Sequence, residues 1–159
     1  MSLILALAVG ACSPAFDWRE TRPPDAGVEL NLPCKPSLQS RRSPTGLRMG
    51  LARCEAGGEE FALSWAELPE PAAAGSAMAQ MHAALLRQLG GQPSQAEPFA
   101  VSGMTPSPEA VMQRVDGASH ARLAVFNRGL KVYQLVVRSD KPIADAHWND
   151  FASSVRLID

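Results

Sequence analysis

The sequence is poor in charged and aromatic residues and in long apolar runs, and each scarcity excludes a class of protein. Charged residues make up 19% of its 159 residues, aromatic residues make up 6%, and the formal net charge is −1. No basic stripe alternates with aromatic side chains, so we do not expect the protein to bind nucleic acid. The apolar run at residues 3–11 is far shorter than the roughly 20 residues of a membrane-spanning helix. What is left is an ordinary globular chain whose length suits one domain.

The short motifs that signal catalysis or a bound cofactor are also missing. There is no G-x-S-x-G, P-loop, dinucleotide fingerprint or H-E-x-x-H pattern. His82, His120 and His147 have no His or Cys three or four residues further on, so each is expected to be a surface or boundary histidine. We therefore expect no catalytic residue, no metal site, no cofactor and no enzymatic activity. A hydrolase of the cell envelope, with a site assembled from dispersed Ser, His and Asp residues, is the alternative.

The first twelve residues carry the sharpest functional signal. Residues 3–11, LILALAVGA, have no polar face, and their number fits the roughly 7–15 residues of a signal peptide's apolar region. The run ends at Val9-Gly10-Ala11-Cys12, which resembles the lipobox of bacterial lipoproteins: an aliphatic residue, two small residues and an obligatory cysteine. The resemblance implies that residues 1–11 are removed and that the sulfur of Cys12 is acylated. The alternative is a short buried helix or strand with Cys12 in the core.

Two further features of this stretch bear on export. Signal peptides open with Lys or Arg, whereas Met1-Ser2 offers neither, so we expect the signal peptide to be truncated in this sequence. By the same resemblance, Ser13 in place of the Asp that retains lipoproteins in the inner membrane implies the periplasmic face of the outer membrane. Two or three acyl chains would make the attachment effectively permanent. A cytosolic domain with a misread N-terminus is a weaker alternative.

Once Cys12 is assigned to the lipid, two cysteines remain. Cys34 and Cys54 each end an expected strand. An even number of cysteines in an oxidising compartment favours a disulfide. A metal or redox role is disfavoured because neither cysteine has a Cys or His within the next few residues, and there is no C-x-x-C. We predict a structural Cys34–Cys54 disulfide, with two free thiols as the alternative.

The apolar residues change period along the chain. Alternation predicts strands, and an apolar stripe at helical spacing predicts a helix. The expected strands are 28–34, 47–54, 61–65, 99–101, 111–115, 121–126 and 130–138, and the expected helices are 71–89 and 143–155. The polar segment 35–45 is expected to be a loop, and Gly90-Gly91 is expected to stop the first helix.

Strands grouped in hairpins with helices between the groups predict an α+β fold, with a mostly antiparallel sheet of about six strands covered by two helices. We expect residues 1–11 to be the signal peptide, 12–26 the lipidated cysteine and a Pro-rich tether with room for a first short strand, and 27–159 a single α+β domain.

This order of elements, with YQLVV at 133–137 and WNDFASSVR at 148–156, resembles the small secreted domains of the PsbP family. The FDWRE stretch at 16–20 is similar to the start of uncharacterised proteobacterial lipoproteins. The resemblance implies an α/β/α sandwich that serves as a binding or assembly module, and it carries over no catalytic residue. The predicted function is therefore a lipid-anchored envelope protein whose domain binds a partner, most simply another envelope protein.

A small basic cluster lies in the segment expected to be a loop. Arg41 and Arg42 are adjacent, with Lys35 and Arg48 nearby. Guanidinium groups pair well with phosphate, so Arg41 and Arg42 are candidates for contact with anionic lipid headgroups near the anchor. The alternative is a soluble loop.

Overall fold

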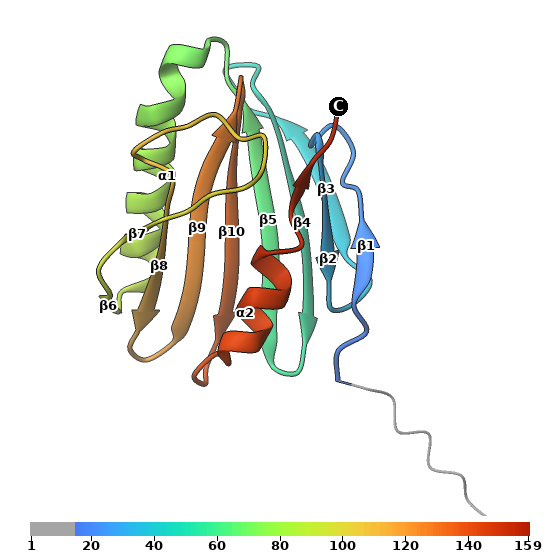
Figure 1. The fold of residues 1–159 in the computed structure, drawn as a ribbon, viewed down its shortest axis with the longest axis vertical. Coiled ribbons are helices and arrows are strands. Elements are labelled where there is room, and N and C mark those ends of the chain that lie inside the picture. The colour runs from blue at the N-terminus through green and yellow to red at the C-terminus, as the bar shows by residue number, and fades with distance from the viewer. Residues whose placement is uncertain (1–14) are drawn as a thin grey trace, which may run out of the picture.

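The described residues of the computed structural model, 15–159, form eleven strands and two α-helices (Figure 1). The predicted signal peptide and Cys12 lie outside these described residues. The elements in chain order are β1 (Arg19–Thr21), β2 (Val28–Leu32), β3 (Ser37–Arg42), β4 (Arg48–Ala56), β5 (Glu59–Glu67), the short 3-10 helix η1 (Pro71–Ala73), α1 (Ala74–Leu89), β6 (Gln92–Pro93), β7 (Glu97–Pro98), β8 (Val111–Asp116), β9 (His120–Arg128), β10 (Lys131–Ser139), α2 (Asp145–Ala152) and β11 (Arg156–Leu157).

The strands form two antiparallel sheets. The larger has eight strands in the order β3-β4-β5-β10-β9-β8-β6, with β7 also paired to β8, and the smaller has the order β1-β2-β11. The β4–β5 turn places Gly57 and Gly58 at φ of 60° and 78°, as the favoured two-residue hairpin turn requires. The predicted α+β class with a mostly antiparallel sheet is confirmed, although there are more strands than we expected. Within residues 15–159, neither α-helix combines the length and the apolar composition of a membrane-spanning segment.

The two helices cover opposite faces of the larger sheet. On one face Val125 and Val132 pack under Met78 of α1. On the other face Phe61 meets Phe151 of α2 edge to face, with ring centroids 5.5 Å apart, and the smaller sheet completes this layer. Because side chains alternate along a strand, β9 and β10 bury apolar residues on both faces. This arrangement is the predicted layering of helix, sheet and helix.

The first helix follows its prediction and the second is shorter than predicted. α1 ends at Leu89, and Gly90 adopts a left-handed φ of 63° while its N–H bonds to the carbonyl of Leu86, a common helix stop. α2 begins only at Asp145 because Ala144 is extended, with φ −64° and ψ 139°. Its predicted end was also too late, since the helix stops at Ala152.

Two predictions about the segments between elements were wrong. The expected loop 35–45 contains β3, whose six residues are all exposed. An edge strand of this kind buries no face, so its sequence shows no apolar alternation. The expected strand at 99–101 is irregular, and the short strands of that region are β6 and β7.

The packed domain begins earlier than the boundary we expected at residue 27. Phe16 and Trp18 pack against the main core, β1 pairs with β2, and Ala26 is fully buried. Residues 16–26 therefore belong to the fold, because their aromatic and apolar side chains cover the open edge of the core beside Phe61.

Candidate functional site: a cleft between α2 and strands β8 and β9

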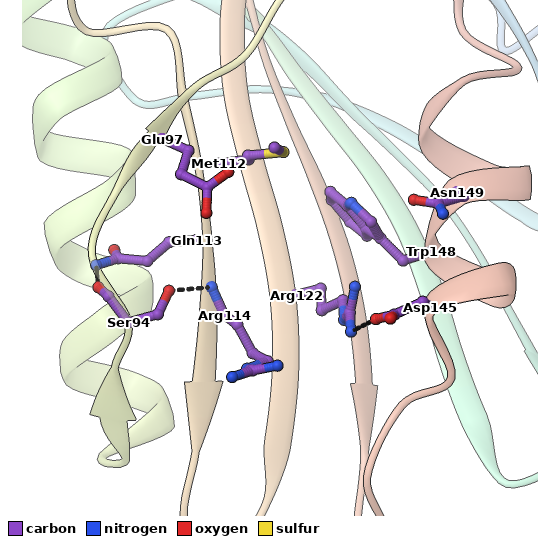
Figure 2. Close-up of a pocket in the computed structure, with 9 residues that line it drawn as sticks. All are labelled: Ser94, Glu97, Met112, Gln113, Arg114, Arg122, Asp145, Trp148 and Asn149. Carbon is purple, nitrogen blue, oxygen red and sulfur yellow. Dashed lines mark hydrogen bonds and ion pairs between the residues drawn. The ribbon is translucent and has the colours of Figure 1, made fainter.

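A cleft of about 290 Å³ opens between α2 and the β8–β9 pair, with the segment around β6 and β7 as its far wall (Figure 2). α2 covers only part of one face of the larger sheet. β8 and β9 lie beside the covered part (Figure 1), so their polar side chains on that face line a hollow next to α2. The lining residues are Ser94, Glu97, Met112, Gln113, Arg114, Arg122, Asp145, Trp148 and Asn149.

Two arginines lie side by side in this cleft. Arg114 on β8 is the register partner of Arg122 on β9. Their neighbours Val115 and Ala121 are buried in the cluster beneath α1, so both guanidinium groups project from the opposite face, toward α2. Like charges directly opposite each other in an antiparallel pair destabilise it. The pairing is therefore an unfavourable arrangement that neighbouring anions must offset.

Arg122 is the more enclosed of the two. Its side chain is 15% exposed and is paired through Nη2 with Asp145, whose own side chain is 80% exposed. Its Nε is buried and has no hydrogen-bond partner within residues 15–159. A buried donor without a partner is costly. The guanidinium thus retains one donor, Nε, that Asp145 leaves unused.

Arg114 belongs to a more exposed group of charges. Its Nε lies 3.0 Å from a carboxylate oxygen of Asp116, and Nδ1 of His120 lies 2.9 Å from the other oxygen of that carboxylate. The hydrogen bond from His120 is the main reason why the pKa of Asp116 lies below its ordinary value, and the charge of Arg114 adds to the effect. The backbone N–H of Arg114 donates to the Ser94 hydroxyl at 3.1 Å, which fixes the far wall to β8.

The upper part of the cleft is less polar. Trp148 of α2 is almost fully buried, and Met112 of β8 packs against the main core. Figure 2 shows Glu97 beside Met112, at the end of the cleft away from the two guanidinium groups. The cleft therefore has a cationic end, and at the other end apolar side chains lie beside one carboxylate, which suits a ligand with one anionic group and an apolar part.

The three histidines are more engaged than we expected. His82 lies 2.8 Å from the Gln113 side chain, and His147 lies 3.0 Å from both carboxylate oxygens of the buried Glu59. Together with the His120 contact, each histidine thus has a polar partner. None of these partners is a serine, so within residues 15–159 no histidine base has a serine nucleophile beside it. The same residues contain no group of three His, Cys, Asp or Glu side chains suited to hold a metal ion.

The two remaining predicted site pairs lie away from the cleft. Cys34 and Cys54 are joined by a disulfide, with their Cα atoms 5.9 Å apart, as the sequence predicted. Arg41 and Arg42 lie at the last two positions of the exposed edge strand β3. Arg42 is the register partner of Arg48, the first residue of β4. Phe16, at the start of the described chain, lies beside Gly57, which directly follows the last residue of β4. The full length of β4 therefore separates the arginine pair from the start of the fold.

A second hollow, of about 450 Å³, lies on the α1 side of β3, β4 and β5. Its walls include the apolar side chains of Met49, Leu51 and Met81, and Arg41 is its only charged lining residue. It offers a single cation, whereas the other cleft offers two adjacent guanidinium groups, so the cleft with the arginine pair is the better defined candidate site.

Neither Arg114 nor Arg122 was predicted to be a site residue. Arg122 lies between Ala121 and Leu123 inside a predicted strand, and that charge between two apolar residues was an available signal; Arg114, between Gln113 and Val115, offered a weaker one. Their pairing depends on the β8–β9 register, and their enclosure depends on where α2 lies, neither of which follows from local pattern.

No protein-family model matches this chain, and no curated protein matches it. Among solved structures, the chain is similar to cyanobacterial PsbP (CyanoP) from Synechocystis sp. PCC 6803, with 14% identity and a TM-score of 0.46 over 94% of this chain and 97% of that chain. It is also similar to a protein from Bacteroides thetaiotaomicron VPI-5482, with 9% identity and a TM-score of 0.44 over 88% of this chain and 48% of that chain.

Proposed function

We propose that this protein is a lipoprotein of the cell envelope, anchored through Cys12 at the periplasmic face of the outer membrane, whose domain serves as a binding or assembly module. The observation that carries the proposal is the Cys34–Cys54 disulfide. Disulfides persist in oxidising compartments, and the periplasm is one. The motif Val9-Gly10-Ala11-Cys12 would direct export to that compartment, and it accounts for the one cysteine that is not part of the disulfide.

The start of the fold supports a short connection to the anchor. The ring of Phe16 lies 4.4 Å from that of His147 and 6.1 Å from that of Phe61, and the N–H of Asp17 bonds to the carbonyl of Pro33 at 2.8 Å. Only Ser13, Pro14 and Ala15 separate Cys12 from Phe16. Four extended residue steps reach about 14 Å, so an acylated Cys12 would hold the domain at the membrane surface.

The same geometry selects the end of the domain that would face the bilayer. Gly57 in the β4–β5 turn lies beside Phe16, and the hydroxyl of Ser139 donates to the carbonyl of Gly58 at 3.2 Å, which adds the end of β10 to this surface. β4 has nine residues and extends about 26 Å. Arg41 and Arg42 would therefore reach headgroups only if the strands lay nearly parallel to the membrane, and their headgroup contact stays a prediction.

The partner is expected to bind on the α2 side, close to the anchored end. α2 carries both Asp145, which pairs with Arg122 in the cleft, and His147, which contacts Phe16. One short helix thus contacts both the cleft and the start of the fold at Phe16, and a bound partner would lie near the membrane surface.

The test is the chemical state and location of the full-length protein in its own host. We expect mass spectrometry to show cleavage before Cys12, added acyl mass and an intact disulfide, and we expect the protein to fractionate with the outer membrane. Cys12→Ser should release it into the soluble periplasmic fraction. The double variant Cys34→Ala/Cys54→Ala is the matched control and should stay with the membrane. Native protein that retains Met1 and a free Cys12 thiol would refute the proposal.

A further inference from the structure

We propose that the cleft is a binding site for a single carboxylate or phosphate group, held by Arg122 with help from Arg114, with the rest of the ligand lying against Trp148. The inference deepens the proposed function by naming a ligand class. It rests on the domain being a binding module and is independent of the lipid anchor.

The first support is the balance of charge across the β8–β9 pair. Arg114 and Arg122 lie directly opposite each other, and each is offset by one carboxylate, Asp116 and Asp145 respectively. Both carboxylates are well exposed, at 49% and 80%. Exposed ion pairs hold their partners weakly. Neither carboxylate bridges the two guanidinium groups in the contacts present, whereas an oxyanion between them would offset both charges at once.

The second support is the state of the Arg122 guanidinium. Asp145 is paired with Nη2, while Nε is buried without a partner. Carboxylate and phosphate groups bind guanidinium through two parallel hydrogen bonds, and Nε with Nη2 is one of the edges that allow this. A ligand that displaced Asp145 into solvent would therefore use both donors and remove the unsatisfied one.

The third support is the shape of the cleft. Its volume is about 290 Å³, which is enough for a small organic anion. The Trp148 ring and Met112 line its upper part, and Glu97 lies at the end away from the guanidinium groups (Figure 2). A second anionic group on the ligand would meet Glu97, so the site favours ligands with one anionic group and an apolar remainder.

The experiment uses the full chain with Cys12→Ser, so that the protein is free of lipid. Three probes are titrated separately: inorganic phosphate, benzoate, and a short-chain phosphatidic acid below its micelle concentration. NMR follows the Nε–Hε signal of Arg122 and the indole N–H of Trp148. We expect both signals to shift saturably with at least one organic probe. A response to benzoate identifies a free carboxylate as a ligand, and a response to the lipid alone identifies a headgroup.

Variants separate binding from structural effects. Arg122→Gln should weaken binding at least about tenfold, and Arg122→Lys should weaken it nearly as much, because an ammonium group lacks the paired donors. Asp145→Asn removes the competing carboxylate and should tighten binding several-fold, which a merely structural role for Asp145 would not produce. Arg138→Gln is the matched control and should leave binding unchanged. Val137 is in register with Arg122, so the next residue, Arg138, points to the opposite face of the sheet, where it pairs with Glu60.

Two results would overturn the inference. One is the absence of a saturable shift at Arg122 with every probe, in the parent protein and in Asp145→Asn alike. The other is binding that Arg122→Gln leaves intact while the variant remains folded. Either outcome leaves the anchor at Cys12 standing, because fractionation and acyl mass test the anchor separately.

Discussion

Removal of the Cys34–Cys54 disulfide should destabilise the domain by an amount that follows from the loop it closes. The two cysteines are separated by 20 positions, and the loop contains β3 and most of β4. A cross-link that closes a loop of this length lowers the entropy of the unfolded chain, which corresponds to about 3 kcal/mol of stability. For a domain of this size, that change lowers the melting temperature by about 10 °C.

The assay is urea unfolding at equilibrium, with Cys12→Ser as the background. The oxidised protein is compared with the same protein after reduction, which leaves every side chain in place, and with Cys34→Ala/Cys54→Ala. We expect both to lose a similar amount of unfolding free energy relative to the oxidised protein. The alanine variant should lose slightly more, because Cys54 is buried at 8% exposure and its sulfur would leave a small space. A loss below about 1 kcal/mol on reduction would contradict the loop-entropy reasoning.

Three further predictions concern single residues. Gly50→Ala should destabilise the domain by about 1–3 kcal/mol, because a Cβ there would lie 2.5 Å from the indole Nε1 of Trp65; unchanged Trp65 fluorescence and stability would contradict this. Burial raises the pKa of Tyr133 to about 12. The Tyr133 hydroxyl therefore stays protonated in the folded state at pH values at which the unfolded chain has lost that proton. Stability should therefore fall as pH rises from about 10 toward 12, and a Tyr133→Phe variant should lose that part of the decline. His120→Ala should raise the pKa of Asp116, measured by NMR titration of its carboxyl carbon, because the His120 hydrogen bond is what chiefly lowers it; an unchanged midpoint would show that Arg114 suffices.

Local sequence pattern was sufficient to predict an element wherever the segment buries one face or ends at a glycine with a positive φ. The alternating strand at 130–138 appears as β10, and its short turn from β9 contains Gly129 at φ 55°. The apolar stripe of α1 ends at Gly90, as expected. In each case the residues that fix the element lie within a few positions of one another, so the signal is complete in the sequence.

Local pattern failed where burial depends on distant segments. β3 is exposed at every position and becomes a strand only because β4 offers its edge. Phe16 and Trp18 were assigned to a tether, yet they pack on Phe61, which lies more than forty positions away. The Pro-rich, polar stretch pointed to a tether with at most one short strand, and nothing in it identified Phe61 as the residue that its aromatic side chains contact.

The period of the apolar residues, the cysteine count and one short motif are enough to predict the class of the fold, the disulfide pair and an anchored protein. No local pattern places Arg114 and Arg122 in one cleft beside α2, or the arginine pair at 41–42 a full strand away from the start of the fold. Both depend on strand register and helix position, which are set by packing between segments far apart in the chain.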